Sequence, residues 1–327
     1  MTERQELPVI NPVAARSLFV LEPIADMMQP RIFTEILAKV QIGAPSGKGP
    51  TFTASGSSSI EALWQVGRHE IDMAVANPSA VLTMAYRGAG PFKEPMDVRV
   101  VATIPSIDWL GIAVAESTGL NSLAEVKERK FPLKLSLYER PGESQDIYTD
   151  ALFAAYGFSL DDIVSWGGSV SRDPGLWIED RYTRAKAGEI DAIIDEGIEW
   201  FIPRLGELGM RLLAVEEPIL AKMAALGLHS SVLPRKLYPN LPGDIVSLDF
   251  SGWPVYTHSA APDHIIYAFC RGLESRMVHP PYRWAGFHDG DDEVNLADLC
   301  NDTILAPLKI PLHPAAERYW RDAGHIA

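Results

Sequence analysis

The chain has few cysteines, no long apolar run and no excess of basic residues, and each shortage excludes a class of protein. Only two cysteines, Cys270 and Cys300, occur among 327 residues. Both are isolated within apolar stretches, so we expect reduced core thiols, and neither a disulfide framework nor a metal-ligand pair. No apolar run approaches the ~20 residues that span a bilayer, so direct membrane insertion is not expected.

Acidic residues outnumber basic ones by 43 to 29, which gives a formal net charge of −14. No window combines clustered lysine and arginine with aromatic residues, so nucleic acid is not an expected partner. The sequence also lacks G-x-S-x-G, G-x-G-x-x-G, Walker A and C-x-x-C motifs, and no cofactor is predicted. The acidic run His288–Glu293 lacks calcium-loop spacing, and we predict a solvated loop without a metal there.

The N-terminus lacks the basic region and the apolar core of a secretory signal. Its one short apolar run, Ser17–Leu21, is predicted to be the first strand of the fold. The sequence as it stands therefore predicts a cytoplasmic protein. A start upstream of Met1 that supplies an export signal is the alternative.

The most informative stretch that is present covers residues 51–78. It predicts a strand, a serine-rich turn at Ser55–Ser59, a helix, a buried strand at Met73–Ala76 and a second turn at Asn77. Two parallel strands would then end in small polar residues at one edge of a sheet. In open α/β sheets that edge binds ligands, and a helix N-terminus adds free N–H groups to it. The stretch therefore predicts a site for a small polar or anionic molecule.

Two motifs resemble those of a known family, the TAXI-type solute-binding proteins of TRAP transporters. Pro311–Gly324, which reads PLHPAAERYWRDAG, is similar to that family's closing "PLHPGAERYYRE-x-G" and is the more specific match. Gly111–Lys127 resembles the segment with which these receptors enter their second domain. The glycine-rich first loop usual in the family is absent, and Ser17–Pro30 stands in its place. The other match, to "GS-x-E-x-L…G-x-x-D-x-A", is formed by Ser57–Ala62, Gly67, Ile71–Ala74 and Asn77-Pro78.

The resemblance covers roughly residues 50–324 and implies an α/β, two-lobed, periplasmic-binding-protein-like fold of type II. Each lobe would be a mostly parallel sheet flanked by helices. It further implies a small organic anion, a carboxylate, bound in a cleft between the lobes, and TRAP membrane subunits as partners of an exported form. Members of the family are normally exported to the periplasm, in contrast to the cytoplasmic expectation above.

An internal echo also indicates two similar lobes. Gly188–Asp195 parallels Gly67–Asn77, because each contains a glycine, an apolar strand with an aspartate, and a small polar residue where the strand ends. We expect residues 1–115 in lobe 1, 116–208 in lobe 2, and 209–327 back in lobe 1, with the return through Arg211–Val215. Two lobes joined by crossings form a cleft with a hinge that closes over a ligand.

Three turns are expected to converge on this cleft. Arg140 has the strongest individual case, since a guanidinium binds a carboxylate through two parallel hydrogen bonds. Asp195, with the adjacent Glu196, is suited to an amine or a hydroxyl. The candidate ligand-binding residues are Ser55, Ser57, Ser58, Asn77, Asp108, Trp109, Arg140, Ser144, Gln145, Trp166 and Asp195.

Each candidate also has a structural alternative. Ser57 and Ser58 are suited to capping a helix, Arg140 to a surface pair with a neighbouring glutamate, and the tryptophans to the core. Asp195 is equally suited to capping the helix that follows it.

A second function stays open beside the binding protein, an enzyme on the same fold. It would be a lyase or decarboxylase of aromatic or dicarboxylic acids, with His258, His264 or Asp195 as acid and base groups. The missing export signal favours the enzyme, whereas the lack of a metal or nucleophile constellation favours the binding protein.

Overall fold

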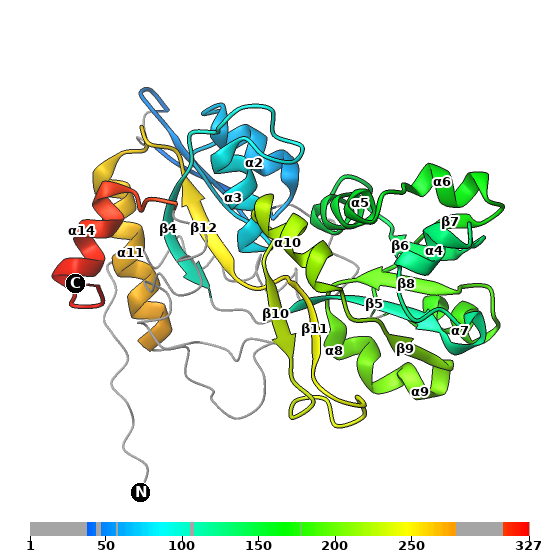
Figure 1. The fold of residues 1–327 in the computed structure, drawn as a ribbon. Coiled ribbons are helices and arrows are strands. Elements are labelled where there is room, and N and C mark those ends of the chain that lie inside the picture. Colours follow the sequence, from blue (N-terminus) through cyan, green and yellow to red (C-terminus); the bar gives the residue numbers. More distant parts are fainter. Residues whose placement is uncertain are drawn as a thin grey trace, which may run out of the picture.

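The structure is a computed structural model that describes residues 38–43, 47–56, 58–104, 108–176, 178–278 and 310–326. Within these ranges the chain forms two α/β lobes side by side, each with its own sheet (Figure 1). We call described residues 38–104 and 253–326 lobe 1, and described residues 108–250 lobe 2. The two-lobed α/β class predicted from the sequence is confirmed. The predicted strand Ser17–Leu21, the loop His288–Glu293, Ser57 and Cys300 lie outside the described residues, and Cys270 is a buried free thiol.

Lobe 1 has a five-stranded sheet in the order β1–β2–β3–β12–β4. The parallel pair β2 and β3 matches the expected strand–helix–strand unit, whereas β12 runs antiparallel to both β3 and β4. Helices α2 and α3 pack on one face of this sheet, and α11 and α14 pack on the other. The elements of lobe 1 are β1 (Lys39–Ile42), β2 (Phe52–Ser55), α2 (Ile60–Gly67), β3 (Met73–Val75), α3 (Ser79–Arg87), β4 (Arg99–Ile104), β12 (Trp253–Thr257), α11 (Asp263–Val278) and α14 (Pro314–Asp322).

The closing segment that resembles the family motif packs on the lobe 1 sheet. The His313 side chain caps α14 by accepting the N–H of Ala315, and the His313 backbone donates to the carbonyl of Val100 in β4. Trp320 is fully buried, and its indole N–H donates to the Val101 carbonyl at 2.8 Å. In this structure the segment therefore completes the core of lobe 1 and lies on the face of the sheet opposite α2 and α3.

Lobe 2 has seven strands in the order β10–β11–β5–β8–β6–β7, with β9 paired to β5 outside this path. Strand β6 is parallel to β7 and β8, and β5 is antiparallel to β8. Its strands are β5 (Trp109–Ala115), β6 (Lys134–Tyr138), β7 (Ser169–Asp173), β8 (Ala192–Asp195), β9 (Met210–Leu212), β10 (Ser230–Leu233) and β11 (Ile245–Asp249). Its α-helices are α4 (Ala124–Glu128), α5 (Ser144–Tyr156), α6 (Leu160–Ser165), α7 (Glu179–Lys186), α8 (Ile198–Phe201), α9 (Leu205–Leu208) and α10 (Glu217–Ala225).

Both sheets are mixed and not mostly parallel. In lobe 1, β1 pairs antiparallel with β2, and β12, which comes from late in the sequence, pairs antiparallel with β3 and β4. In lobe 2, β5 pairs antiparallel with β8, β9 and β11, and β10 pairs antiparallel with β11. β5 and β12 are also the strands that receive the chain after each crossing between the described parts of the lobes.

The chain returns to lobe 1 later than the sequence predicted. Residues 210–212 form β9, which pairs with Ala113–Ala115 of β5 in the lobe 2 sheet. On that side of β5, strand β11 covers only the first two residues, so the remaining backbone groups are paired by β9. The return lies between β11 and β12, after residue 249, and the segment Arg211–Val215 therefore stays with lobe 2.

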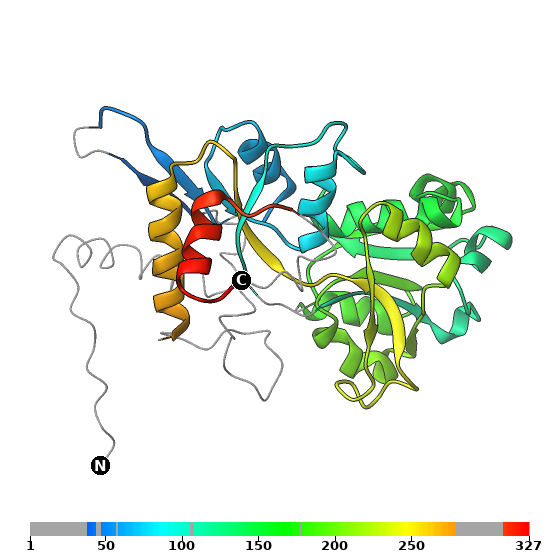
Figure 2. The same cartoon turned by 60° about the vertical axis from the view of Figure 1, so that its left-hand side comes forward.

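Between the described strands the chain crosses from one lobe to the other twice, once from β4 to β5 and once from β11 to β12 (Figure 2). A pair of strand-to-strand crossings is the usual location of a hinge, because a few residues there absorb the change in backbone angles.

Candidate functional site

The lobes face each other with the carboxyl ends of their parallel strands and with the beginnings of helices. In lobe 1, β2 ends at Ser55 and the loop after β3 carries Asn77. In lobe 2, β6 ends at Tyr138, β8 ends at Asp195, and α5 begins at Ser144. Strand ends and helix N-termini of this kind supply free backbone N–H groups and short polar side chains to a ligand.

A cluster of polar side chains joins the two lobes at this edge. The Asn77 side-chain Nδ2 donates to the carboxylate of Glu196, at 3.0 Å from Oε2 and 3.4 Å from Oε1. From lobe 2, Gln145 Nε2 donates to Glu196 Oε1 at 2.9 Å. The Ser144 hydroxyl donates to the Asn77 backbone carbonyl at 2.5 Å. We call Asn77, Ser144, Gln145 and Glu196 the interlobe cluster, and three of its members were predicted from the sequence.

A second contact between the lobes lies one residue before α5. The carboxylate of Glu143 accepts the backbone N–H of Ile60, the first residue of α2. Burial raises the pKa of Glu143, and the positive charge of Arg140 acts against this rise. A carboxylate of the chain itself therefore lies at the N-terminus of α2, where the helix dipole and the free N–H groups favour negative charge.

The serine turn before α2 divides its roles. Ser55 is buried at the end of β2, and Ser58 is exposed. The helix is capped by Ser59, whose hydroxyl accepts the N–H of Ala62 at 3.2 Å. The helix cap that we considered for Ser57 and Ser58 is therefore provided by the next serine, Ser59, which directly precedes the first helical turn.

Arg140 is exposed at the end of β6, on the loop that leads to α5. Its Nε and Nη2 donate to the hydroxyl of Tyr138 at 3.1 and 2.6 Å, and its guanidinium lies 5.1 Å from the centre of that ring. The expected alternative was a pair with Glu139 or Glu143, and instead the guanidinium rests on Tyr138. Its position beside Glu143 places a positive charge at the rim of the interlobe cluster.

Asp108 links residues of the two crossings through hydrogen bonds. Its carboxylate accepts the N–H of Trp109 at 2.7 Å and the N–H of Gly197 at 2.8 Å. Its backbone carbonyl accepts the N–H of Phe250 and the hydroxyl of Ser251, which belong to the second crossing. The side chain predicted to flank the ligand therefore binds two backbone N–H groups, and the Asp108 backbone carbonyl binds the second crossing.

Trp109 and Trp166 are not brought to the interlobe cluster. Trp109 is 4% exposed and packs inside lobe 2 with residues of α8, among them Phe201. Trp166 ends α6 and packs against Phe158, at a ring distance of 5.9 Å. Both side chains therefore pack in the core, the structural alternative considered above and the more common environment of a large apolar ring.

Asp195 is engaged in a buried ion pair. Its carboxylate pairs with Nη1 of Arg181, which is fully buried, and its other oxygen accepts the N–H of Glu196 at 2.9 Å. Arg181 also donates to the hydroxyl and the carbonyl of Ser136 in β6, at 2.7 and 3.1 Å. Burial raises the pKa of Asp195, and Arg181 opposes that rise. The pair therefore fixes the loop from which Glu196 extends to the interlobe cluster.

The histidines of the enzyme alternative do not reach the interlobe cluster. The register that pairs Thr257 with Met73 puts His258 at the opposite edge of the lobe 1 sheet, where its Nε2 lies 3.2 Å from Asp72. His264 lies in the first turn of α11, on the outer face of that sheet. Within the described residues, no group of three or more histidine, cysteine or acidic side chains is arranged to hold a metal.

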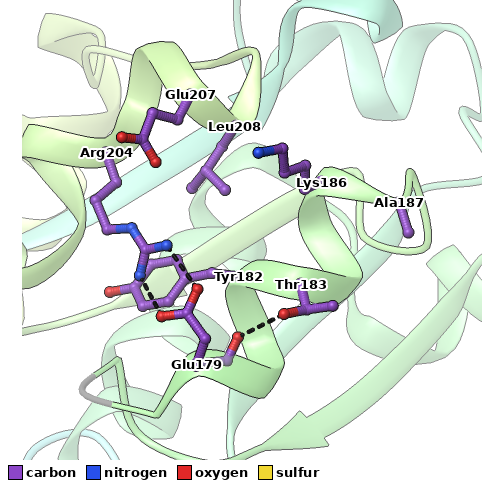
Figure 3. Close-up of a pocket in the computed structure, with 8 residues that line it drawn as sticks. All are labelled: Glu179, Tyr182, Thr183, Lys186, Ala187, Arg204, Glu207 and Leu208. Carbon is purple, nitrogen blue, oxygen red and sulfur yellow. Dashed lines mark hydrogen bonds and ion pairs between the residues drawn. The ribbon is translucent and has the colours of Figure 1, made fainter.

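A separate pocket of about 410 Å³ lies on lobe 2 between α7 and α9 (Figure 3). Arg204 lies over the ring of Tyr182 at 3.9 Å and binds the carboxylate of Glu179 through two hydrogen bonds of 2.8 Å. The pocket includes none of the residues predicted from the sequence. Glu207 and Lys186 also line it.

No protein-family model matches the chain. Solved structures are similar at low identity over most of its length. They include periplasmic binding proteins. BugD, a periplasmic binding protein, is 15% identical with a TM-score of 0.44, over 82% of this chain and 85% of its own. MatC from Rhodopseudomonas palustris, solved with bound malate, is 12% identical with a TM-score of 0.40, over 80% and 77%. XAC2383 from Xanthomonas citri, bound to ATP, is 10% identical with a TM-score of 0.42, over 81% of both chains.

These TM-scores are all below 0.5, so the description of the fold rests on the strand order and the crossings given above. The TAXI subtype remains a resemblance of sequence motifs. Among the described residues, no helix has both the length and the apolar character needed to cross a membrane.

Proposed function

We propose that this chain is a solute-binding protein that holds a small carboxylate-bearing molecule between its two lobes. The observation that carries the proposal is the interlobe cluster, in which Asn77 of lobe 1 contacts both Ser144 and Glu196 of lobe 2. Polar side chains from both lobes converge there, at the carboxyl ends of parallel strands. This edge is where open α/β sheets bind ligands.

The position of Glu143 supports a carboxylate as the ligand group. An oxygen of this side chain accepts the N–H of Ile60 at the N-terminus of α2, a position that also suits a ligand carboxylate. A ligand carboxylate would compete for the same N–H groups and for the guanidinium of Arg140. Ser55, Ser57 and Ser58 remain proposed contacts on the lobe 1 side, and Ser144 and Gln145 on the lobe 2 side.

Closure would be reversible because few bonds hold the lobes at this edge. Opening breaks the contacts of Asn77 with Ser144 and Glu196 and the contact of Glu143 with Ile60. A hydrogen bond to a carboxylate contributes about 1.5–3 kcal/mol net and a neutral one about 0.5–1.5 kcal/mol, so the three together contribute about 3.5–7.5 kcal/mol. A ligand of micromolar affinity binds with about 8 kcal/mol and can therefore shift this equilibrium.

Such a receptor would deliver its ligand to membrane transport subunits, which the sequence resemblance indicates are of the TRAP type. A transport receptor of this kind would act in the periplasm, as BugD is described as a periplasmic binding protein. This location differs from the cytoplasmic one expected from the N-terminus. If the protein is not exported, the same binding function would make it a cytoplasmic sensor or carrier. Cell fractionation with N-terminal sequencing of the mature protein distinguishes the two.

The binding function is tested by thermal unfolding of the purified protein with a panel of carboxylic, hydroxycarboxylic and amino acids. Binding raises the unfolding temperature, and calorimetry of each positive compound gives its affinity. Small-angle scattering should show a smaller radius of gyration at saturation. A panel without a single binder would contradict the proposed function, and binding with an unchanged radius would contradict closure.

A further inference from the structure

The side-chain amide of Asn77 has a fixed orientation. A carboxylate only accepts hydrogen bonds, so the Asn77 atom that faces Glu196 must be the NH₂ group, 3.0 Å from Oε2. The amide of Gln145 is oriented in the same way by the same carboxylate, at 2.9 Å. The Asn77 carbonyl oxygen Oδ1 therefore faces away from Glu196.

This Oδ1 atom is shielded from solvent and receives no hydrogen bond from the described part of the chain. Two residues further along, the hydroxyl oxygen of Ser79 is likewise buried and unpartnered within the described ranges, and Ser79 is only 3% exposed. Buried acceptors are normally paired, so an unpaired one between two lobes indicates a donor that the described part of the chain does not supply.

The lobe 2 side chain that contacts the Asn77 amide, Glu196, is negatively charged. Glu196 brings its carboxylate to the Asn77 amide, and Asp249 lies at the end of β11 near the second crossing. Both carboxylates affect the fully buried Tyr148, whose pKa is raised well above its usual value by burial, with Asp249 and Glu196 adding to the rise. A donor that carries positive charge fits this environment better than a neutral one.

We propose that the ligand carries a protonated amine, which donates to Asn77 Oδ1 and lies against the carboxylate of Glu196. An ammonium offers three donors and can reach both acceptors at once. Charge-assisted hydrogen bonds are also roughly twice as strong as neutral ones. This inference rests on the proposed function and narrows its substrate class, from carboxylates in general to amino acids and related amine-bearing carboxylates.

The test uses matched compounds that differ only in the group on one carbon. Three series are titrated by calorimetry: alanine, lactate and propionate; aspartate, malate and succinate; phenylalanine, 3-phenyllactate and 3-phenylpropionate. In the series that binds, the amino acid should bind at least about tenfold more tightly than the plain acid, with the hydroxy acid between them. A plain or hydroxy acid that binds as tightly as its amino acid would overturn the inference and leave the proposed function standing. Failure of all nine compounds would overturn both.

A variant tests whether the interlobe cluster causes the preference for an amino acid over the plain acid. Glu196→Gln keeps the size of the side chain and its acceptor oxygen but removes the charge, so the ratio between amino acid and plain acid should fall at least about fivefold. Glu207→Gln, which removes one exposed carboxylate on α9, is the matched control and should leave the ratio unchanged. An unchanged ratio in folded Glu196→Gln would exclude Glu196 as the partner of the amine. Should this variant not fold, the wild-type ratios alone decide the ligand class.

Discussion

Replacement of Arg181 by methionine tests how the core of lobe 2 supports the interlobe cluster. Arg181 is fully buried, and its guanidinium bonds the Asp195 carboxylate and the hydroxyl and carbonyl of Ser136. The variant leaves the buried Asp195 carboxylate without its counter-charge. Breaking a buried pair on one side costs about 3–5 kcal/mol, because the remaining charge stays in a poorly solvated place.

This loss is large enough to measure in a chain of this size. At about 2–4 °C per kcal/mol, the unfolding temperature should fall by about 6–20 °C, provided that unfolding is reversible. The matched control is Arg204→Met, since Arg204 also binds a carboxylate through a fork but does so at the surface, with Glu179. Exposed pairs contribute little, so we expect a small change in the control.

A double replacement separates the lost charge partner from the lost packing. In Arg181→Met with Asp195→Leu, both charges are gone, and most of the stability should return, because an apolar pair often replaces a buried ion pair without loss. The assay is thermal and urea unfolding followed by circular dichroism. The reasoning is refuted if Arg181→Met unfolds at no lower temperature than Arg204→Met. It is also refuted if the double variant is no more stable than Arg181→Met alone.

Four further predictions concern other parts of the molecule. Arg140→Ala should weaken carboxylate binding at least tenfold, or about 1.4 kcal/mol, with partial recovery in Arg140→Lys, as measured by calorimetry. Trp320→Ala should destabilise lobe 1 by about 3–5 kcal/mol in urea unfolding, since it empties a fully buried site and removes the hydrogen bond to the Val101 carbonyl. Asp108→Ala should destabilise lobe 2 by about 1–3 kcal/mol in urea unfolding, because the N–H groups of Trp109 and Gly197 lose their shared acceptor. Burial lowers the pKa of His258, so the unfolded state binds its proton more readily, and stability should fall as the pH drops below about 6.5. The His258→Gln variant should show a flatter dependence over that range.

The sequence predicted local elements well where periodicity and capping chemistry act over a few residues. The β2–α2–β3 unit follows from apolar spacing and from the serines before α2, which place Asn77 at a strand end. The Ser144 and Gln145 candidates were also found, because a turn followed by a helix N-terminus is recognisable from residue types alone.

Features that depend on pairing between distant segments could not be predicted. β9 looks like any short apolar run, and its place beside β5 is decided by which backbone groups β11 leaves unpaired. The sequence named Asp195 and the adjacent Glu196 together, but only the buried position of Arg181 shows that the first is neutralised and the second extends to the other lobe. A buried arginine gives no local signal, since it occurs in a helix that is otherwise polar.

A crystal structure of the protein with the tightest-binding compound of the matched series tests the central claim most directly. The account predicts density between the lobes, with ligand contacts to Asn77 on one side and to Glu196 or Arg140 on the other. Density in the pocket between α7 and α9, or contacts confined to a single lobe, would contradict it.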